Sequence, residues 1–281
     1  MDTTLDALQA WIGRSETLTD TVTATPLRLM RALVDLPPDD TFAEVPPLWH
    51  WLYFLPGARQ SEIGEDGHPR RGGFLPPVPL PRRMWAGGQL EFFGSLQVGD
   101  AIRRTSTIDD VKVKTGRTGA LCFVRVRHEV SGPRGLALRE FHDIVYRDQP
   151  APGAPAPRYE QAPPSVLARR VVPDDVLLFR YSALTFNGHR IHYDRRYVTG
   201  VEGYPGLVVH GPLLATLLAG LAMRQFVGRS AAKFSFRAHK PVFDLHPFEV
   251  CGRPDGADAC ELWIRDAVGD KAMSARMEFS V

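Results

Sequence analysis

The residues best suited to chemistry are five polar side chains that precede a strongly apolar stretch in the second half of the chain: Asn187, His189, His192, Asp194 and His210. A histidine can accept and return a proton near neutral pH, because the ordinary pKa of imidazole is about 6.5. An asparagine cannot take up a proton, but its amide oxygen accepts hydrogen bonds and its NH2 group donates them. The group therefore has the composition of a site that holds a water molecule and moves protons.

The element that must position these side chains is a predicted buried helix over residues 212–226. Gly211-Pro212 marks its start, since proline is tolerated in the first turn of a helix. Its leucines, alanines and methionine leave no polar stripe, so the helix should be covered on several sides. Fifteen residues are too few to cross a bilayer. The first N–H groups of such a helix lack partners within it and are suited to stabilising negative charge.

Both halves of the chain predict the same order of elements, a helical part followed by strands. Alternating apolar residues and intervening turns predict strands over 89–93, 101–113, 120–130 and 136–147 in the first half, and over 233–242, 248–253, 259–266 and 271–281 in the second. Thr25-Pro26 starts a predicted helix through Leu36. An antiparallel meander wrapped round an apolar helix is a hot-dog fold. The predicted class is α+β, a double hot-dog with its two sheets joined edge to edge.

Six prolines between 150 and 164 predict a stiff connection between the halves. We therefore expect an N-terminal half at 1–149, a linker at 150–165 and a C-terminal catalytic half at 166–281. The first half has no Asn/Asp-x4-His segment before a comparable helix. We expect one active site per chain, which the second half builds and the first half covers.

Two segments, TFNGHRIH at 185–192 and VVHGP at 208–212, carry a family resemblance. They resemble the MaoC-like enoyl-CoA hydratases, whose motif places an acidic residue and a histidine five positions apart. The residues of these segments are most similar to those of the branch that includes hydroxyacyl-thioester dehydratase type 2 and the mesaconyl-C4-CoA (3-methylfumaryl-CoA) and itaconyl-CoA hydratases. His192 matches the family histidine, whereas Asn187 stands at the acidic position.

The resemblance implies a hydro-lyase that adds water to a double bond conjugated to a CoA thioester. His192 is then the general base, Asn187 orients the water, and the Gly211 N–H stabilises the enolate oxygen. His189 or Asp194 could carry the second proton. His189 and His210 are expected to line the substrate site, although His210 could instead only brace the turn before the helix.

Arginines are the candidate contacts for the negative charges of the substrate. In the branch that the chain resembles most, the acyl group is a branched C5 dicarboxylate, and a guanidinium fork suits its free carboxylate. Arg190 and Arg180, the latter expected on a strand before the motif, are candidates for this contact. Arg82 and Arg83, in a long Gly/Pro/Arg-rich segment at 56–83, could meet the coenzyme phosphates, or could simply be solvated.

Composition excludes several other classes of protein. With 281 residues, 44% hydrophobic and 23% charged, the chain is neither disordered nor a membrane protein, and a net charge of +2 gives no general reason to expect nucleic acid. Three scattered cysteines predict no disulfide framework. We expect no cofactor and no metal, because no further cluster completes a site with His189, His192 and Asp194. The acidic, amphipathic start is unlike a signal peptide, so a cytoplasmic location is expected.

Three kinds of function remain in view. A hydratase would convert itaconyl-CoA or mesaconyl-C4-CoA to citramalyl-CoA, or, as a dehydratase, act on fatty hydroxyacyl thioesters. A hot-dog thioesterase would release free CoA thiol, but Asn187 lacks the carboxylate that this reaction normally requires. A non-catalytic acyl-CoA-binding subunit would bind the ligand without turnover. A homodimer of double hot-dog chains is the expected assembly.

Overall fold

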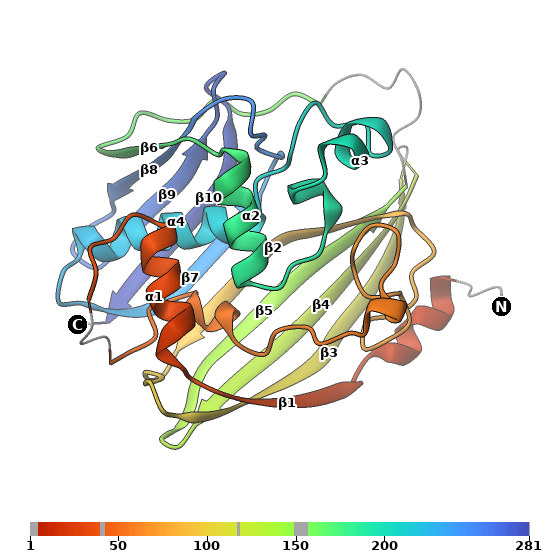
Figure 1. Cartoon of the computed structure of the whole chain (residues 1–281), viewed down its shortest axis with the longest axis horizontal. Helices are drawn as coiled ribbons and strands as arrows, with labels where there is room; N and C mark the ends of the chain where they lie inside the picture. The colour runs from red at the N-terminus through yellow and green to blue at the C-terminus, as the bar shows by residue number, and fades with distance from the viewer. Residues whose placement is uncertain (1–4, 40–42, 117–118, 149–156, 281) are drawn as a thin grey trace.

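One antiparallel sheet of ten strands forms the body of the protein. The structure is a computed structural model that describes residues 5–39, 43–116, 119–148 and 157–280. The strand order is β1-β3-β4-β5-β2-β7-β10-β9-β8-β6 (Figure 1). The strands are β1 (Ser15–Thr21), β2 (Arg82–Phe92), β3 (Ala101–Gly116), β4 (Gly119–Gly132), β5 (Gly135–Arg147), β6 (Leu167–Val171), β7 (Ser230–Ala238), β8 (Phe248–Pro254), β9 (Ala259–Arg265) and β10 (Lys271–Ser280).

The two halves of the sheet have the same strand order and meet at the pair β2–β7. The first half runs β1-β3-β4-β5-β2 and the second, read inward, runs β6-β8-β9-β10-β7. At the junction, Gly87 lies opposite Arg237 and Gly88 opposite Phe236. A Cβ added at Gly87 would lie 2.6 Å from the Phe236 carbonyl oxygen, so the close approach of the strands requires glycine there. The expected double hot-dog, with its sheets joined edge to edge, is confirmed.

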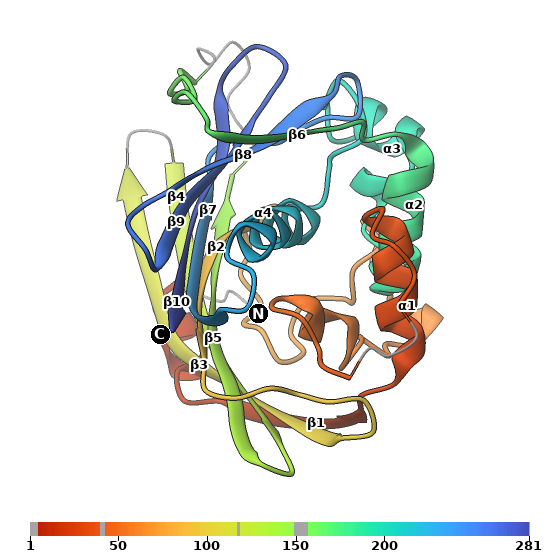
Figure 2. The same ribbon diagram turned by 90° about the vertical axis from the view of Figure 1, so that its left-hand side faces the viewer.

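The α-helices lie on one side of the sheet, with α4 nearest to it (Figure 2). The helical elements are η1 (Leu5–Trp11), α1 (Ala24–Leu33), η2 (Trp49–Leu52), η3 (Gln60–Glu62), α2 (Asp175–Leu184), η4 (Arg190–His192), α3 (Arg195–Gly200) and α4 (Gly211–Gln225), where η marks a 3-10 helix. Nine of the fifteen residues of α4 are buried, as its missing polar stripe predicted. It packs on β7, β8, β9 and β10, so the core of the second half sits between this helix and the sheet.

Between β1 and β2 the first half has no long buried helix like α4 among its described residues. The apolar run after Pro46-Pro47 forms only the single turn η2, because Leu48 and Phe54 on either side adopt positive φ of 70° and 57°. The aromatic side chains of this run pack into the hydrophobic core in place of such a helix. The prediction of one architecture used twice therefore holds for the sheet but not for the central helix.

Two local predictions from the sequence are wrong or incomplete. Arg180 was expected on a strand, but it lies on α2, whose first turn is capped by Asp174 accepting a hydrogen bond from the Leu177 N–H at 2.8 Å. The short outer strands β1 and β6 were not predicted, because seven- and five-residue segments that are largely exposed carry little alternation. The predicted division at 150–165 stays a prediction, since residues 149–156 lie outside the described part.

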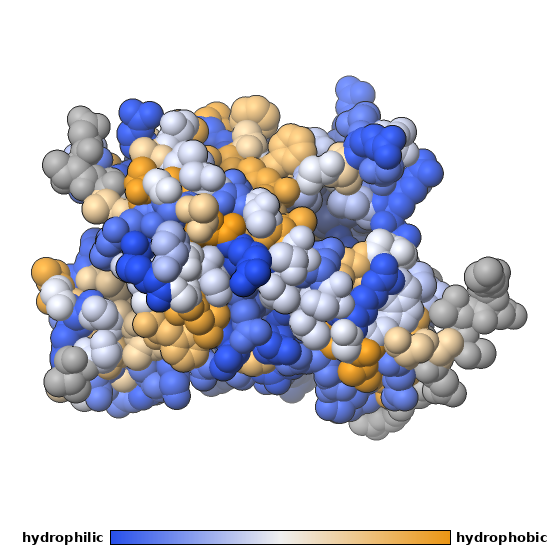
Figure 3. All heavy atoms as spheres, turned by 90° about the horizontal axis from the view of Figure 1, so that it is seen from below, coloured by the Kyte–Doolittle hydropathy of each residue, from blue (hydrophilic) through white to orange (hydrophobic). Residues whose placement is uncertain are grey.

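The remaining features of the fold concern its surface and its thiols. No helix among the described residues is long and apolar enough to cross a membrane. On the face seen from below, hydrophilic residues separate the hydrophobic ones into patches (Figure 3). The three cysteines, Cys122, Cys251 and Cys260, are free and buried, as the scattered positions predicted.

Candidate active site

Asn187 is positioned by the way α2 ends. The Phe186 N–H donates to Ala183 O at 3.3 Å, and the Asn187 N–H donates to Ser182 O at 2.8 Å, the two hydrogen bonds of a Schellman motif. Phe186 adopts the left-handed φ of 49° at the position usually held by glycine. The Asn187 side-chain oxygen then accepts the His189 N–H at 3.0 Å. Among the described residues, its NH2 group makes no hydrogen bond and stays available to a ligand.

His192 is buried, with a ring orientation fixed by the segment that precedes α4. Its Nδ1 lies 2.7 Å from the Val208 carbonyl oxygen, and the Val208 N–H donates back to Ile191 O at 3.0 Å. A carbonyl oxygen can only accept, so Nδ1 carries the hydrogen and Nε2 of the neutral ring is the free acceptor. Burial lowers the pKa of His192 to about 4, although the hydrogen bond to Val208 opposes this shift.

His210 links His192 to the start of α4. It is the N-cap residue of that helix, is fully buried, and its Nε2 lies 2.8 Å from the Ser182 hydroxyl. The rings of His192 and His210 stack with centroids 3.7 Å apart. Burial, reinforced by the neighbouring imidazoles of His192 and His189, holds the pKa of His210 well below its ordinary value. The His192 imidazole therefore lies beside the helix N-terminus, where Gly211 begins α4.

A loop of the first half docks against the motif of the second. The Arg190 N–H donates to Asp66 O at 2.9 Å, and the ring of His68 lies 4.0 Å from that of His189. Gly67 and Gly188 pack backbone against backbone, since a Cβ added at Gly67 would lie 1.8 Å from Gly188 O. Burial, followed by the rings of His68 and His192, lowers the pKa of His189 to about 2. His189 is thus a neutral ring between the two halves of the chain.

Asp194 is occupied by structural contacts. One carboxylate oxygen accepts the Tyr197 N–H at 3.0 Å and caps α3, while the other accepts Arg190 Nη2 at 2.7 Å. The hydrogen bond from Tyr197, followed by that from Arg190, lowers the pKa of Asp194. A carboxylate held ionised by these donors is poorly suited to carry the second proton.

The four candidate arginines have different surroundings. Arg190 pairs with Asp194, donates to Glu65 O at 3.0 Å and lies 4.2 Å over the Tyr197 ring. Arg180 is exposed on α2. Arg82 donates to Glu202 O at 3.1 Å.

Arg83 differs from these three, because its charge acts on the imidazoles of both His68 and His189. It forms no ion pair among the described residues. Its side chain does hydrogen-bond to Tyr146. Arg83 is therefore the candidate whose charge acts on the site without a carboxylate partner among the described residues.

Two clusters contain groups that could bind a metal ion: Asp66, His68 and His189 beside the motif, and His128, Glu140 and His142 in the first half. In the first cluster the Asp66 carboxylate and His68 Nδ1 bind each other at 3.1 Å, as in a hydrogen-bonded dyad. In the second, Glu140 accepts Trp51 Nε1 at 2.9 Å and lies 3.0 Å from His142 Nε2. Burial alone would raise the pKa of Glu140, but the imidazoles of His142 and then His50 hold it well below its usual range. Both carboxylates are satisfied by protein groups.

Comparison with known proteins identifies the family. Residues 48–244 match hydroxyacyl-thioester dehydratase type 2. Mesaconyl-C(4)-CoA hydratase of Chloroflexus aurantiacus is 48% identical over 273 residues, covering 96% of each chain. The chain belongs to the hydroxyacyl-thioester dehydratase type 2 family. It is an enzyme of the hydro-lyase class, as the resemblance implied.

More distant relatives agree with this placement. The mitochondrial hydroxyacyl-thioester dehydratase type 2 of Schizosaccharomyces pombe is 25% identical over 259 residues, covering 80% of this chain and 82% of the other. A MaoC-like dehydratase from Phytophthora capsici has a TM-score of 0.71 at 13% identity, covering 99% of both chains. A Mycobacterium tuberculosis protein described as a double hotdog fold has a TM-score of 0.60 at 12% identity, covering 98% and 97%. These two structures support the fold alone.

Asp66 and His68 were missed by the sequence reasoning. The segment 56–83 was singled out for its arginines, and the carboxylate and imidazole two positions apart within it were not considered. A short Asp-Gly-His sequence in a glycine-rich loop is the signal that could have drawn attention to them. Its placement beside His189 depends on contacts across more than 120 residues, which spacing within the loop does not predict.

Proposed function

We propose that this enzyme reversibly adds water to the double bond of an enoyl-CoA thioester, with His192 as the group that accepts the proton of water. The observation that carries the proposal is the hydrogen bond from His192 Nδ1 to the Val208 carbonyl at 2.7 Å, because it leaves Nε2 as the basic nitrogen. The lowered pKa supports it, since the ring is neutral at pH 7. The 48% identity to a mesaconyl-C(4)-CoA hydratase supports the reaction class.

In the hydration direction, water gives a proton to His192 Nε2 while its oxygen bonds to the β-carbon. The electron pair of the double bond moves toward the thioester carbonyl, and negative charge develops on that oxygen. The Gly211 N–H, in the first turn of α4, stabilises this charge. A Cβ added at Gly211 would meet no atom within 4 Å, so the space beside this residue is open. A proton delivered to the α-carbon completes the product.

Asn187 orients the attacking water. Its side-chain oxygen is committed to the His189 N–H, so the free NH2 group donates to the water oxygen and turns a lone pair toward the substrate. An aspartate at this position would share the proton with His192, whereas an amide cannot. His192 is therefore the base for the water.

The substrate we propose is a branched C5 dicarboxylic enoyl-CoA, mesaconyl-C4-CoA, which yields citramalyl-CoA. Identity of 48% over nearly the whole length favours it over a fatty hydroxyacyl thioester, since the mitochondrial hydroxyacyl-thioester dehydratase type 2 is only 25% identical. Itaconyl-CoA reaches the same product, but its double bond lies one carbon farther from the thioester, so a proton shift precedes hydration.

Arg83 is our candidate for the free carboxylate of that substrate, because its guanidinium acts on His68 and His189 and has no acidic partner among the described residues. This assignment replaces Arg190, which is committed to Asp194, and Arg180, which is exposed on α2. His189 lines the acyl end of the site, whereas His210, which is fully buried and bonds to Ser182, braces the start of α4. Arg82 is kept as a contact for the coenzyme.

The test is to incubate the purified protein with mesaconyl-C4-CoA, itaconyl-CoA and crotonyl-CoA and to follow product mass together with free thiol. A mass gain of one water on mesaconyl-C4-CoA, lost in His192→Gln and retained in His239→Gln, is expected. His239 is the matched control because it bonds to Ser274 on the sheet, away from the motif. Release of free thiol would instead identify a thioesterase, and binding without turnover would identify a carrier subunit.

A dimer of these chains and a cytoplasmic location stay predictions. The face of the sheet opposite the α-helices has a hollow of about 960 Å³ lined by residues of both halves, including Arg125, Asp143 and Arg237. None of the residues that line this hollow belongs to the segments 185–192 and 208–212. We propose this face as the contact with a second copy. Sedimentation of a species of about twice the 31.3 kDa chain mass would support the dimer, and a sharp monomer at micromolar concentration would exclude it.

A further inference from the structure

The loop that brings Asp66 and His68 to the motif is tightly folded. The Gly64 N–H donates to His68 O at 2.7 Å, and the Gly67 N–H donates to Gly64 O at 3.0 Å. Arg190 reaches across from the second half and donates to Glu65 O and Asp66 O. With the contact between the Gly67 and Gly188 backbones, these bonds fix the loop against η4 without leaving room for a side chain. The first half therefore contributes residues to the site.

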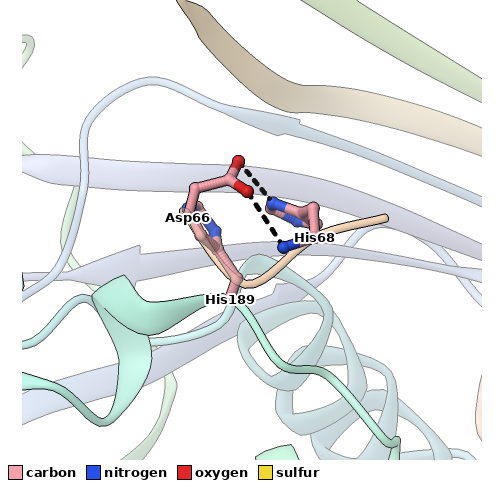
Figure 4. Close-up of side chains that lie close together, drawn as sticks. All are labelled: Asp66, His68 and His189. Carbon is pink, nitrogen blue, oxygen red and sulfur yellow. Dashed lines mark hydrogen bonds and ion pairs between the residues drawn. The ribbon is translucent and has the colours of Figure 1, made fainter. Parts of the chain in front are cut away.

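Within this loop, Asp66 and His68 form a carboxylate–imidazole dyad (Figure 4). One oxygen of Asp66 lies 3.1 Å from His68 Nδ1, and the other accepts the His68 backbone N–H at 3.0 Å. An ionised carboxylate only accepts, so Nδ1 carries the hydrogen and Nε2 is the nitrogen that exchanges protons. A carboxylate in this position orients an imidazole and stabilises the imidazolium form, as in catalytic triads.

A row of four imidazole rings begins with His68 of this dyad and ends with His210 at the start of α4. The ring of His68 lies 4.0 Å from that of His189, which meets the His192 ring edge-on at 5.4 Å, and His192 stacks on His210 at 3.7 Å. Among the described residues, His68 is the only one of the four that hydrogen-bonds to a carboxylate. Burial lowers the pKa of His68 as well, but the hydrogen bond to Asp66 opposes this shift. Of the four rings, His68 is thus the one on which a positive charge is best stabilised.

The reaction needs a second group that handles a proton, and the motif residues do not supply it. Asn187 does not take up protons, Asp194 is held ionised by Tyr197 and Arg190, and burial keeps His189 neutral. His192 is used for the water. The proton of the α-carbon has no carrier within residues 187–194.

We propose that His68, held by Asp66, is the acid–base group for the α-carbon of the substrate, which makes the active site a product of both halves of the chain. The inference rests on the hydratase function proposed above. During hydration, His192 Nε2 takes a proton from water as the C–O bond forms, and the His68 imidazolium gives its Nε2 proton to the α-carbon as the enolate electron pair forms the C–H bond. One proton then passes from His192 to His68 through solvent and resets the pair. Dehydration reverses each transfer.

The experiment compares kcat and KM for His68→Gln, Asp66→Asn and the control His239→Gln, using whichever enoyl-CoA the wild type hydrates. Glutamine can still donate to Asp66 but cannot transfer protons, so kcat should fall about 10²–10⁴-fold with KM within about threefold of wild type. Asp66→Asn keeps a hydrogen-bond acceptor but removes the negative charge, and kcat should fall by about tenfold. The control should match wild type, and melting temperatures show whether each variant folds.

Each result decides the matter. A kcat within tenfold of wild type in folded His68→Gln overturns the inference, as does a rise in KM with kcat unchanged, which indicates a binding role. If His68→Gln does not fold, wild-type kcat in Asp66→Asn overturns it. Activity lost on incubation with a chelator and restored by Zn²⁺ also overturns it, in favour of a metal held by this cluster. A wild type that hydrates no enoyl-CoA refutes the proposed function itself, whereas an active wild type with an active His68→Gln refutes only the inference.

Discussion

Replacing Gly67 by alanine should separate the loop of the first half from the motif. The position has φ of +88°, which costs an alanine about 1–2 kcal/mol. The added Cβ would also lie 1.8 Å from the Gly188 carbonyl oxygen, whereas real Cβ contacts stay above 3.0 Å. The two backbones must therefore separate by about 1.2 Å. Because the neighbour is backbone, no side-chain rotation relieves the contact.

Gly72 provides the matched control within the same segment. Its φ is +92°, so alanine carries a similar conformational cost, but the added Cβ would meet only the Pro77 Cβ at 3.9 Å. Gly72→Ala should lose about 1–2 kcal/mol of unfolding free energy in urea, and Gly67→Ala should lose more, because its contact with Gly188 adds to the same conformational cost. Only Gly67→Ala should lose activity, by about 10²-fold in kcat/KM, because a displacement near 1 Å at a reacting group has an effect of that order.

The assay is steady-state hydration of the best enoyl-CoA, run beside urea unfolding of both variants. Wild-type activity in both variants would refute the reasoning, because docking of the loop on residue 188 would then not matter for turnover. An equal loss of activity in both variants would also refute it, since the backbone conformation of the segment, rather than the contact, would then be the cause.

Three further outcomes follow from the site and the core. Hydration requires a neutral His192, whose pKa is lowered to about 4, and a protonated His68, whose pKa burial lowers below its ordinary value. We therefore expect kcat/KM for hydration to rise as pH falls from 7 and then to fall tenfold per unit below about 4, and a loss of activity between pH 7 and 6 would contradict this. His189, His192 and His210 are neutral in the folded protein, because their pKa values are lowered. As pH falls below about 6.5, these histidines take up protons in the unfolded chain but not in the folded one, so each should lower the free energy of unfolding by up to about 1.4 kcal/mol per pH unit. Urea unfolding between pH 7 and 5 measures this loss. Leu218→Ala, at a fully buried position of α4, should cost about 2–5 kcal/mol, and a loss below 1 kcal/mol would show that α4 is not the centre of the core.

Much of the fold could be predicted from local pattern. The missing polar stripe of 212–226 required a covered helix, and α4 begins at Gly211, one residue earlier than predicted. Alternation placed seven of the ten strands within about four residues, because each has one face on the core. For β2 it predicted only 89–93, whereas the strand runs from Arg82 to Phe92 and includes the end of the segment taken as a loop. The outer strands β1 and β6 escaped prediction because most of their side chains are exposed, and Arg180 was misplaced because α2 has no clear apolar face to distinguish it from a strand.

The site was predicted in part. The five-residue spacing between Asn187 and His192 was visible in the sequence. The tautomer of His192 was not, since it depends on the Val208 carbonyl sixteen residues later. Arg190 and Asp194 had been considered for chemistry, but the structure commits them to each other. Such competition among neighbours is decided by three-dimensional geometry, not by residue type.

By itself, the sequence determined a buried helix, two sheets of strands and one motif with a histidine suited to proton transfer. It could do so because periodicity and spacing are local properties of the chain. Only the tertiary structure decided that Asp66 and His68 share the site with His189 and His192. The edge-to-edge junction of β2 and β7 holds the two halves together, and the bare backbones of Gly67 and Gly188 let the loop approach. Contacts between residues more than 120 positions apart leave no periodic trace in the sequence, so they emerge only when the chain is folded.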